Sequence, residues 1–296
     1  MFKDEDLPVD RIVTLLPSAT EIVCGLGLRD RLVGVTHECD YPASVQELPE
    51  VTRSSIDVDL SSSEIDSAVR KHLQTKSALY SIDKALLVSL RPELLITQAL
   101  CNVCAVSETD VLEVLSELPG EPTLINLEPT TLREVFDTIN LVGRAVGCVA
   151  KAKSYVTSLD ERVNKVREAA RLISTKPRVG FLEWLDPPFN GGHWTPELIE
   201  YAGGVDCFGN KYEPSQTIDH MTILAADPDI LIISLCGFDE IRARQELEAV
   251  KRKFDYASLS AVRNDRVYVV DGNSFFSRPG PRLVDALELL LNLLHS

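Results

Sequence analysis

Several cysteine and histidine side chains of this 296-residue sequence have the types and spacing of a soft metal site. Thiolate and imidazole groups are ligands that zinc and other transition metals prefer. The candidate ligands lie in separate turn-rich segments and are Cys39, Cys101, Cys104, His193 and Cys236. Cys101 and Cys104 form a single CxxC pair, a weak signal because structural zinc sites normally bring a second pair. An isolated cysteine is more often a small buried apolar residue. The set therefore predicts transition-metal coordination only as an alternative.

Aromatic residues suggest a second kind of site, for a flat and largely apolar molecule. The segment EWLDPPFNGGHW, residues 183–194, places three large rings in a turn-rich loop, although loops usually run through water. Aromatic rings offer a large contact area at little entropy cost, which suits a planar ligand. For each ring the alternative is that it closes the core beneath the loop. The predicted ligand contacts are Trp184 and Trp194 first, with Phe189, Phe238, Phe275 and Phe276 in the same set.

The elements that must position these residues alternate between short apolar runs and helical patterns. Such alternation is typical of βαβ units and mainly parallel sheets. Strands are predicted in one cluster at 11–16, 32–36, 93–97 and 123–127, and in a second at 178–182, 229–234 and 266–271. Ligands gather at the carboxyl ends of parallel strands, so the loops after these strands are expected to hold the site.

Helix starts are predicted from capping residues. The expected capping boxes are Ser18 with Glu21, Ser107 with Asp110 and Thr131 with Glu134, the last two ahead of helices at 111–118 and 132–146. Thr195 is the expected N-cap of a short helix that Gly203 ends.

The segment 149–173 differs, because its apolar residues step by three and four in one narrow stripe. This pattern predicts a helix about 37 Å long at 1.5 Å per residue. A coiled-coil dimer competes with an intramolecular helix, but about three and a half heptads with Ala at two seam positions make a weak zipper. We therefore expect an N-terminal α/β lobe at 1–148, a linking helix at 149–174 and a C-terminal α/β lobe at 175–296.

Composition and charge narrow the classes of partner. The net charge of −15, from 45 acidic against 30 basic residues, argues against binding to nucleic acid or to an anionic membrane. No segment approaches the roughly 20 apolar residues of a membrane helix. The acidic start and the seven scattered cysteines predict a cytoplasmic protein, periplasmic only if a signal had been removed. No Ser-His-Asp order, Walker loop or GxGxxG is present, so we do not expect an enzyme.

Three motifs carry a resemblance to a known family: LPSATEIVCGLGLRDRLVGVTHECDYP at 16–42, DPPFNGGHWTPELIEYAGG at 186–204 and RPGPRLVDALELL at 278–290. In this order, around one long helix, they resemble the cobalamin and ferric-siderophore substrate-binding proteins of ABC importers, with the cobalamin-binding branch closest. The resemblance covers essentially the whole chain. A stretch near 61–90 looks longer than in that family. The receptors of that family use an exposed acid on each lobe to dock on arginines of the transporter, and the loop 217–222 of this sequence offers only Asp219 for that contact.

The resemblance implies two α/β lobes with mainly parallel sheets, bridged by one long rigid helix, with the ligand in a cleft between the lobes. It also implies a small-molecule ligand and an ABC transporter permease as partner. Carried over to this sequence, it places ligand contacts on the loops after the strands, and the candidates are Pro17, Ser18, Glu38, Gln98, Trp184, Phe189, His193, Trp194, Phe238, Phe275 and Arg278.

Three hypotheses follow from these observations. The first is a binding protein, monomeric, that holds a cobalamin-like corrinoid or another metallated macrocycle or metal chelate. The second is a cytosolic metal-binding protein or enzyme in which the cysteine and histidine set ligates a metal directly. The third makes the long helix a dimer seam and the cleft a groove for a partner.

Overall fold

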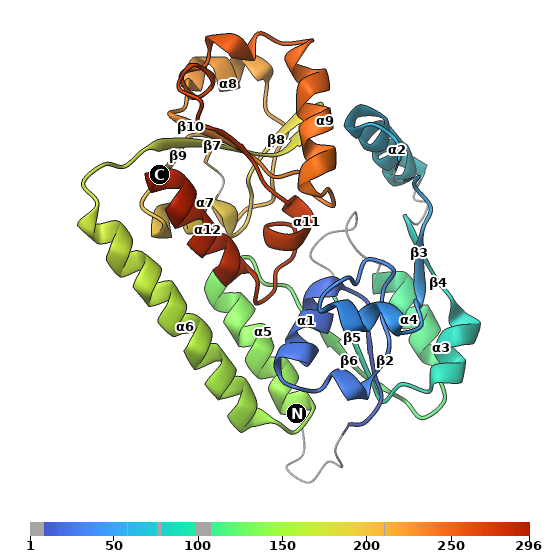
Figure 1. Cartoon of the computed structure of the whole chain (residues 1–296). Coiled ribbons are helices and arrows are strands. Elements are labelled where there is room, and N and C mark those ends of the chain that lie inside the picture. Colours follow the sequence, from blue (N-terminus) through green and yellow to red (C-terminus); the bar gives the residue numbers. More distant parts are fainter. Residues whose placement is uncertain (1–8, 58, 76–78, 99–107, 210) are drawn as a thin grey trace. The chain divides into compact units, whose positions relative to one another are not determined.

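The computed structural model describes residues 9–57, 59–75, 79–98, 108–209 and 211–296, which form two compact units (Figure 1). Unit 1 consists of Met1–Asp59, Ser67–Pro129 and Arg133–Ser158, and unit 2 of Leu60–Asp66, Thr130–Leu132 and Leu159–Ser296. Each unit has its own sheet and its own apolar core.

Unit 1 is built on a parallel four-stranded sheet of order β2-β1-β5-β6. These strands are β1 (Ile12–Thr14), β2 (Leu32–Gly34), β5 (Leu94–Thr97) and β6 (Thr123–Asn126). Residues of β1 and β5 are buried throughout, as expected of central strands covered on both faces. A separate antiparallel pair joins β3 (Thr52–Ser54) to β4 (Tyr80–Ile82). The helices of unit 1 are α1 (Pro17–Gly25), α3 (Lys84–Leu90), α4 (Glu108–Glu117) and α5 (Leu132–Ala145), with 3₁₀ turns at Arg29–Arg31 and Ala43–Glu47.

Unit 2 is built around β7 (Arg178–Leu185), which pairs in parallel with β10 (Ile230–Ile233) and β9 (Val205–Asp206) and antiparallel with β8 (Pro188–Asn190). The strand β11 (Val267–Val269) extends the sheet beyond β10, again in parallel. The remaining elements are α7 (Thr195–Tyr201), α8 (His220–Ala226), α9 (Glu240–Lys251), a 3₁₀ turn at Tyr256–Ser258, α10 (Ser260–Arg263), α11 (Gly272–Phe275) and α12 (Leu283–His295).

Residues of both units occur in α2 (Ser62–Thr75), in α5 through its first residue Leu132, and in the long α6 (Val149–Leu172). The helix predicted at 149–173 is thus confirmed. Within unit 1, α5 and α6 approach so closely that a Cβ on Gly143 would lie 2.3 Å from the Cβ of Ala152. Within unit 2, Arg162 on α6 donates to both Asp285 and Glu288 on α12, at 2.5 and 2.7 Å from Nη2. These contacts hold each part of α6 on the unit to which it belongs.

The predicted fold class of two α/β lobes with mainly parallel sheets is confirmed, and every predicted strand contains or lies within an observed one. The division between the units falls inside α6 and does not test the predicted domain boundaries. Two predicted caps are wrong. The helix α1 begins at Pro17 with Leu16 as N-cap, so Ser18 lies inside its first turn, and α7 begins at Thr195 with Trp194 as N-cap. Proline in the first turn favours an earlier start, by two residues in α1 and by one residue in α7.

Candidate functional site

At the carboxyl ends of its parallel strands, unit 2 brings together a group of aromatic rings. Trp184 lies near the end of β7, and Phe238 follows β10. Their ring centroids are 5.2 Å apart and the planes are tilted by 59°. The guanidinium carbon of Arg242 lies 3.8 Å from the centroid of the Phe238 ring. Phe238 is buried, whereas Trp184 is half-buried and packs against the unit 2 core.

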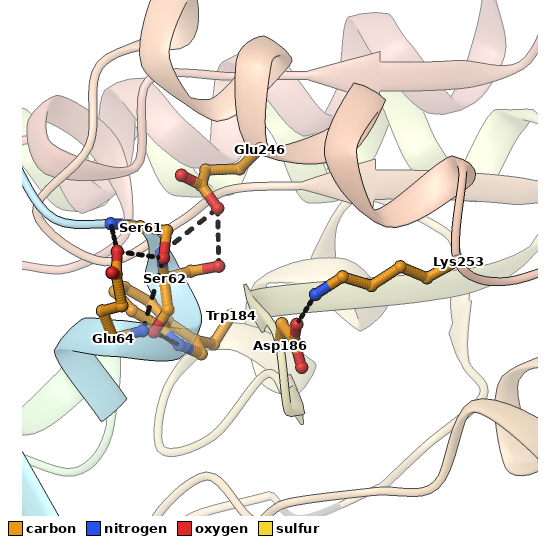
Figure 2. Close-up of polar contacts among 7 residues, drawn as sticks. All are labelled: Ser61, Ser62, Glu64, Trp184, Asp186, Glu246 and Lys253. Atoms are coloured by element: carbon orange, nitrogen blue, oxygen red, sulfur yellow. Dashed lines mark hydrogen bonds and ion pairs between the residues drawn. The ribbon is translucent and has the colours of Figure 1, made fainter. Parts of the chain in front are cut away.

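Trp184 is held by a second contact, from the start of α2. Its indole N–H donates to the carbonyl oxygen of Ser62 at 3.2 Å (Figure 2). Phe189 on β8 pairs with Trp184 in the antiparallel register and is also half-buried. The structure therefore places two of the predicted ligand contacts, Trp184 and Phe189, side by side on one strand pair. The contact with Ser62 was not foreseen from the sequence.

The loop that joins β8 to α7 is held by backbone contacts with residues 212–216. His193 has a left-handed backbone, with φ of 49°, and its N–H donates to the carbonyl of Glu213 at 2.7 Å. A Cβ on Gly192 would lie 2.3 Å from the backbone nitrogen of Ser215, so only glycine fits there. Backbone hydrogen bonds and the glycine together give this segment one conformation.

Trp194 has the environment of a core side chain. It is 6% exposed, and its indole N–H donates to the carbonyl of Phe276 at 3.0 Å. Phe276 is also buried and packs on Phe181, with ring centroids 4.9 Å apart. This geometry corresponds to the alternative that the sequence left open for each ring, closure of the core beneath the loop.

The ring of His193 stacks on Trp194, with centroids 5.4 Å apart and planes 24° from parallel. Burial lowers the pKa of this imidazole, with the nearby Glu213 as a smaller opposing influence. Among the described residues its buried Nδ1 has no hydrogen-bond partner. This nitrogen can donate or accept a hydrogen bond, depending on the tautomer of the ring.

The segment after β11 carries Phe275 and Arg278. A Cβ on Gly272 would lie 2.1 Å from the carbonyl oxygen of Leu235, so the start of α11 lies directly against the loop that carries Phe238. Phe275 is half-buried, and Arg278 is buried with Nη2 donating to Asn273 Oδ1 at 2.9 Å. The loops after β10 and β11 are thus packed as one layer.

In unit 1 the predicted contacts also follow strands of the sheet. Pro17 and Ser18 open α1 directly after β1, and Gln98 follows β5. Ser18 and Gln98 are both buried. Glu38 is exposed and accepts a hydrogen bond from the Tyr80 hydroxyl at 3.2 Å.

The proposed metal ligands are not gathered in the part of the chain that the structure describes. There, no three His, Cys, Asp or Glu side chains lie close enough to hold a metal. Cys39 is buried in unit 1 with its Sγ 3.0 Å from Thr20 Oγ1, which suits a core thiol. Cys236 is half-buried in unit 2. Cys101 and Cys104 lie outside the described residues.

No helix among the described residues has the length and apolar character needed to cross a membrane.

Comparisons with known proteins agree over most of the chain. The sequence profile of a family described as periplasmic binding protein matches residues 12–273. An uncharacterized ABC transporter substrate-binding lipoprotein of Bacillus subtilis strain 168 is 25% identical over 293 residues, which cover 95% of this chain and 78% of that protein. A vitamin B12-binding protein of Vibrio cholerae is 26% identical over 287 residues, which cover 95% and 87%. The crystal structure of a periplasmic vitamin B12-binding protein of Vibrio cholerae has a TM-score of 0.71 at 23% identity and covers 97% of both chains.

The chain belongs to the periplasmic binding protein family. The prediction of a binding protein in place of an enzyme is confirmed, because the family and these relatives are solute-binding proteins. The prediction of a cytoplasmic protein is wrong, since the family is periplasmic and the relatives are named as periplasmic proteins or lipoproteins. That prediction rested on the first residues and on the cysteines, and neither of these determines the compartment.

Proposed function

We propose that this member of the family is the extracytoplasmic substrate-binding protein of an ABC importer and that its ligand is a cobalamin-like corrinoid. The observation that carries the proposal is the likeness over nearly the whole chain to relatives named for vitamin B12 binding and for ABC transport. The small-molecule ligand would then be passed to an ABC transporter permease.

The chemistry of unit 2 supports a flat ligand with a large apolar surface. Trp184 offers a half-buried ring beside Phe238 and Phe189, at the strand ends where parallel sheets bind ligands. Phe275 and the buried Arg278 lie on the adjoining segment. In this proposal the rings contact the face of the macrocycle, and Arg278 and His193 meet its polar substituents.

Unit 1 contributes polar side chains that can contact the ligand. Ser18, at the start of α1 after Pro17, and Gln98, after β5, lie at the carboxyl ends of neighbouring strands. Glu38 lies in the loop that follows β2 and carries a carboxylate that accepts from Tyr80. In the proposal these side chains hydrogen-bond the amide groups around a corrin ring.

The test uses the two tryptophans of the sequence as separate reporters. Cyanocobalamin is titrated into the full chain by calorimetry, and in parallel into the Trp194→Phe and Trp184→Phe variants with emission as readout. The proposal expects saturable binding, with strong quenching in Trp194→Phe, where Trp184 is the remaining fluorophore. Haemin and a ferric hydroxamate siderophore are titrated as competitors. Saturable binding of either, with none of cyanocobalamin, would replace the corrinoid by that ligand.

A further inference from the structure

The segment Leu60–Asp66 folds with unit 2, although the residues on both sides of it in the sequence fold with unit 1. Two residues of α9 hold it there. Glu246 Oε2 accepts from the backbone N–H of Ser62 at 3.2 Å and from its hydroxyl at 2.6 Å, and Arg242 Nη2 donates to the Leu60 carbonyl at 2.6 Å. Ile65 packs against the core of unit 2. The segment therefore has several independent anchors on α9 and the core.

The start of α2 is also internally ordered. Ser61 and Glu64 form a reciprocal capping box. Glu64 Oε2 accepts from the Ser61 N–H at 2.9 Å and from its hydroxyl at 2.6 Å, and Ser61 Oγ accepts from the Glu64 N–H at 3.4 Å. The carboxylate of Glu64 lies beside Ser61, and that of Glu246 lies beside Ser62 (Figure 2). With its first N–H groups paired, the turn presents the Ser62 carbonyl in one fixed direction.

That carbonyl is the acceptor of the Trp184 indole N–H. Ser62 thus donates to Glu246 through its N–H and its hydroxyl, and accepts from Trp184 through its carbonyl. On the other side, Phe238 packs against the Trp184 ring and Arg242 covers Phe238. An indole has a single donor, so this hydrogen bond selects one of the ring orientations that a half-buried tryptophan can adopt.

We propose that Glu246 is a positioning residue of the ligand site: by holding Ser62 against α9, it fixes the indole of Trp184 in the orientation that the ligand meets. The inference rests on the proposed function, because it concerns Trp184 as a ligand contact. Glu246 itself does not touch the ligand. Without its carboxylate, the Ser62 N–H and hydroxyl lose their acceptor, the first turn of α2 loosens, and the indole loses its fixed partner.

The experiment uses the Trp194→Phe protein, so that Trp184 is the remaining fluorophore, with three changes on α9. Glu246→Ala removes the acceptor, Glu246→Gln retains one acceptor oxygen, and Glu248→Ala is the control. Glu248 is exposed on the same helix and pairs with Lys251. The emission maximum and the acrylamide quenching of Trp184 are measured without ligand, and affinity is then measured with cyanocobalamin as the probe.

For Glu246→Ala we expect red-shifted emission and stronger acrylamide quenching, together with a fall in affinity for cyanocobalamin of about 2- to 10-fold, the factor that one hydrogen bond supplies. Glu246→Gln is expected to retain most of both properties, and Glu248→Ala all of them. This rescue by glutamine distinguishes a positioning role from a loss of stability.

Other results would overturn the inference. Unchanged emission and quenching in Glu246→Ala would show that Glu246 does not hold Trp184, whatever the ligand. Tighter cyanocobalamin binding in that variant would show that the segment Leu60–Asp66 obstructs the indole. If no variant bound cyanocobalamin but the emission changed as expected, the corrinoid proposal would fail while the positioning of Trp184 would stand.

Discussion

The contact between α5 and α6 gives a quantitative prediction for the exchange of one methyl group. A Cβ at Gly143 would lie 2.3 Å from the Cβ of Ala152, about 1 Å short of ordinary van der Waals contact. In Gly143→Ala the two helices must separate, and such overpacking costs about 1–3 kcal/mol of unfolding free energy. The higher helix propensity of alanine offsets about 1 kcal/mol of this cost. The single variant should therefore lose roughly 0–2 kcal/mol of unfolding free energy.

The reciprocal variant, Ala152→Gly, removes a buried methyl and adds a helical glycine, a loss of about 2 kcal/mol from the two effects. The double variant returns one methyl to the same space and exchanges one helical glycine for another. Its loss should be about 0–1 kcal/mol, well below the sum of the single losses. The favourable coupling should thus be about 1–4 kcal/mol, or several degrees of melting temperature.

The coupling is measured by urea unfolding followed by circular dichroism on the wild type, both single variants and the double variant. Gly120→Ala, at a site with nothing within 4 Å of the added Cβ, is the control for which no coupling with Ala152→Gly is expected. Additivity of Gly143→Ala and Ala152→Gly to within about 0.5 kcal/mol would refute the close packing of α5 on α6.

Three further predictions concern stability and the candidate site. Arg162→Met should lower the melting temperature by a few degrees, because about 1 kcal/mol or less per partly exposed ion pair is lost, and the difference should shrink in about 1 M salt. Arg162 also lowers the pKa of Glu288, so the wild-type advantage over Arg162→Met should fade as the pH falls through the usual carboxyl range, and melting scans at pH 7 and pH 3 would show it. Because burial lowers the pKa of His193, the unfolded chain binds more protons there and stability should fall as the pH drops below 6.5. His193→Asn, which tolerates the left-handed backbone, should reduce that fall in melting scans, and an unchanged slope would contradict it. Gly192→Ala should destabilise unit 2 and weaken ligand binding, since its Cβ meets the backbone of Ser215; equal affinity in calorimetry would count against the loop's role.

Much of the fold could be predicted because local patterns and packing agree. The apolar runs that became β5 and β10 are buried at every residue, and the stripe at 149–173 became α6 because that one face packs on its neighbours. The predicted caps at Ser18 and Thr195 were wrong for a local reason, since Pro17 and Pro196 lie in the first turn of each helix.

The candidate site was predicted less completely, because its contacts are long-range. The sequence identified Trp184 and Trp194 equally as ligand contacts, and only their packing distinguishes them. Trp194 donates to Phe276 in the core, whereas Trp184 remains half-buried. Ser62 lies 122 positions from Trp184 and 184 from Glu246. The S-x-x-E pattern at Ser61 was a readable signal for the helix start, but nothing local indicates that this turn contacts an indole.

The central claim is that the chain binds a cobalamin-like corrinoid through Trp184. Its most direct test is the titration of cyanocobalamin into the Trp194→Phe protein, monitored by emission and by calorimetry. The claim predicts saturable, stoichiometric binding that quenches Trp184 and is weakened in the protein that also carries Trp184→Ala. The absence of heat and of quenching at high micromolar cyanocobalamin, in a protein that is folded by circular dichroism, would contradict it.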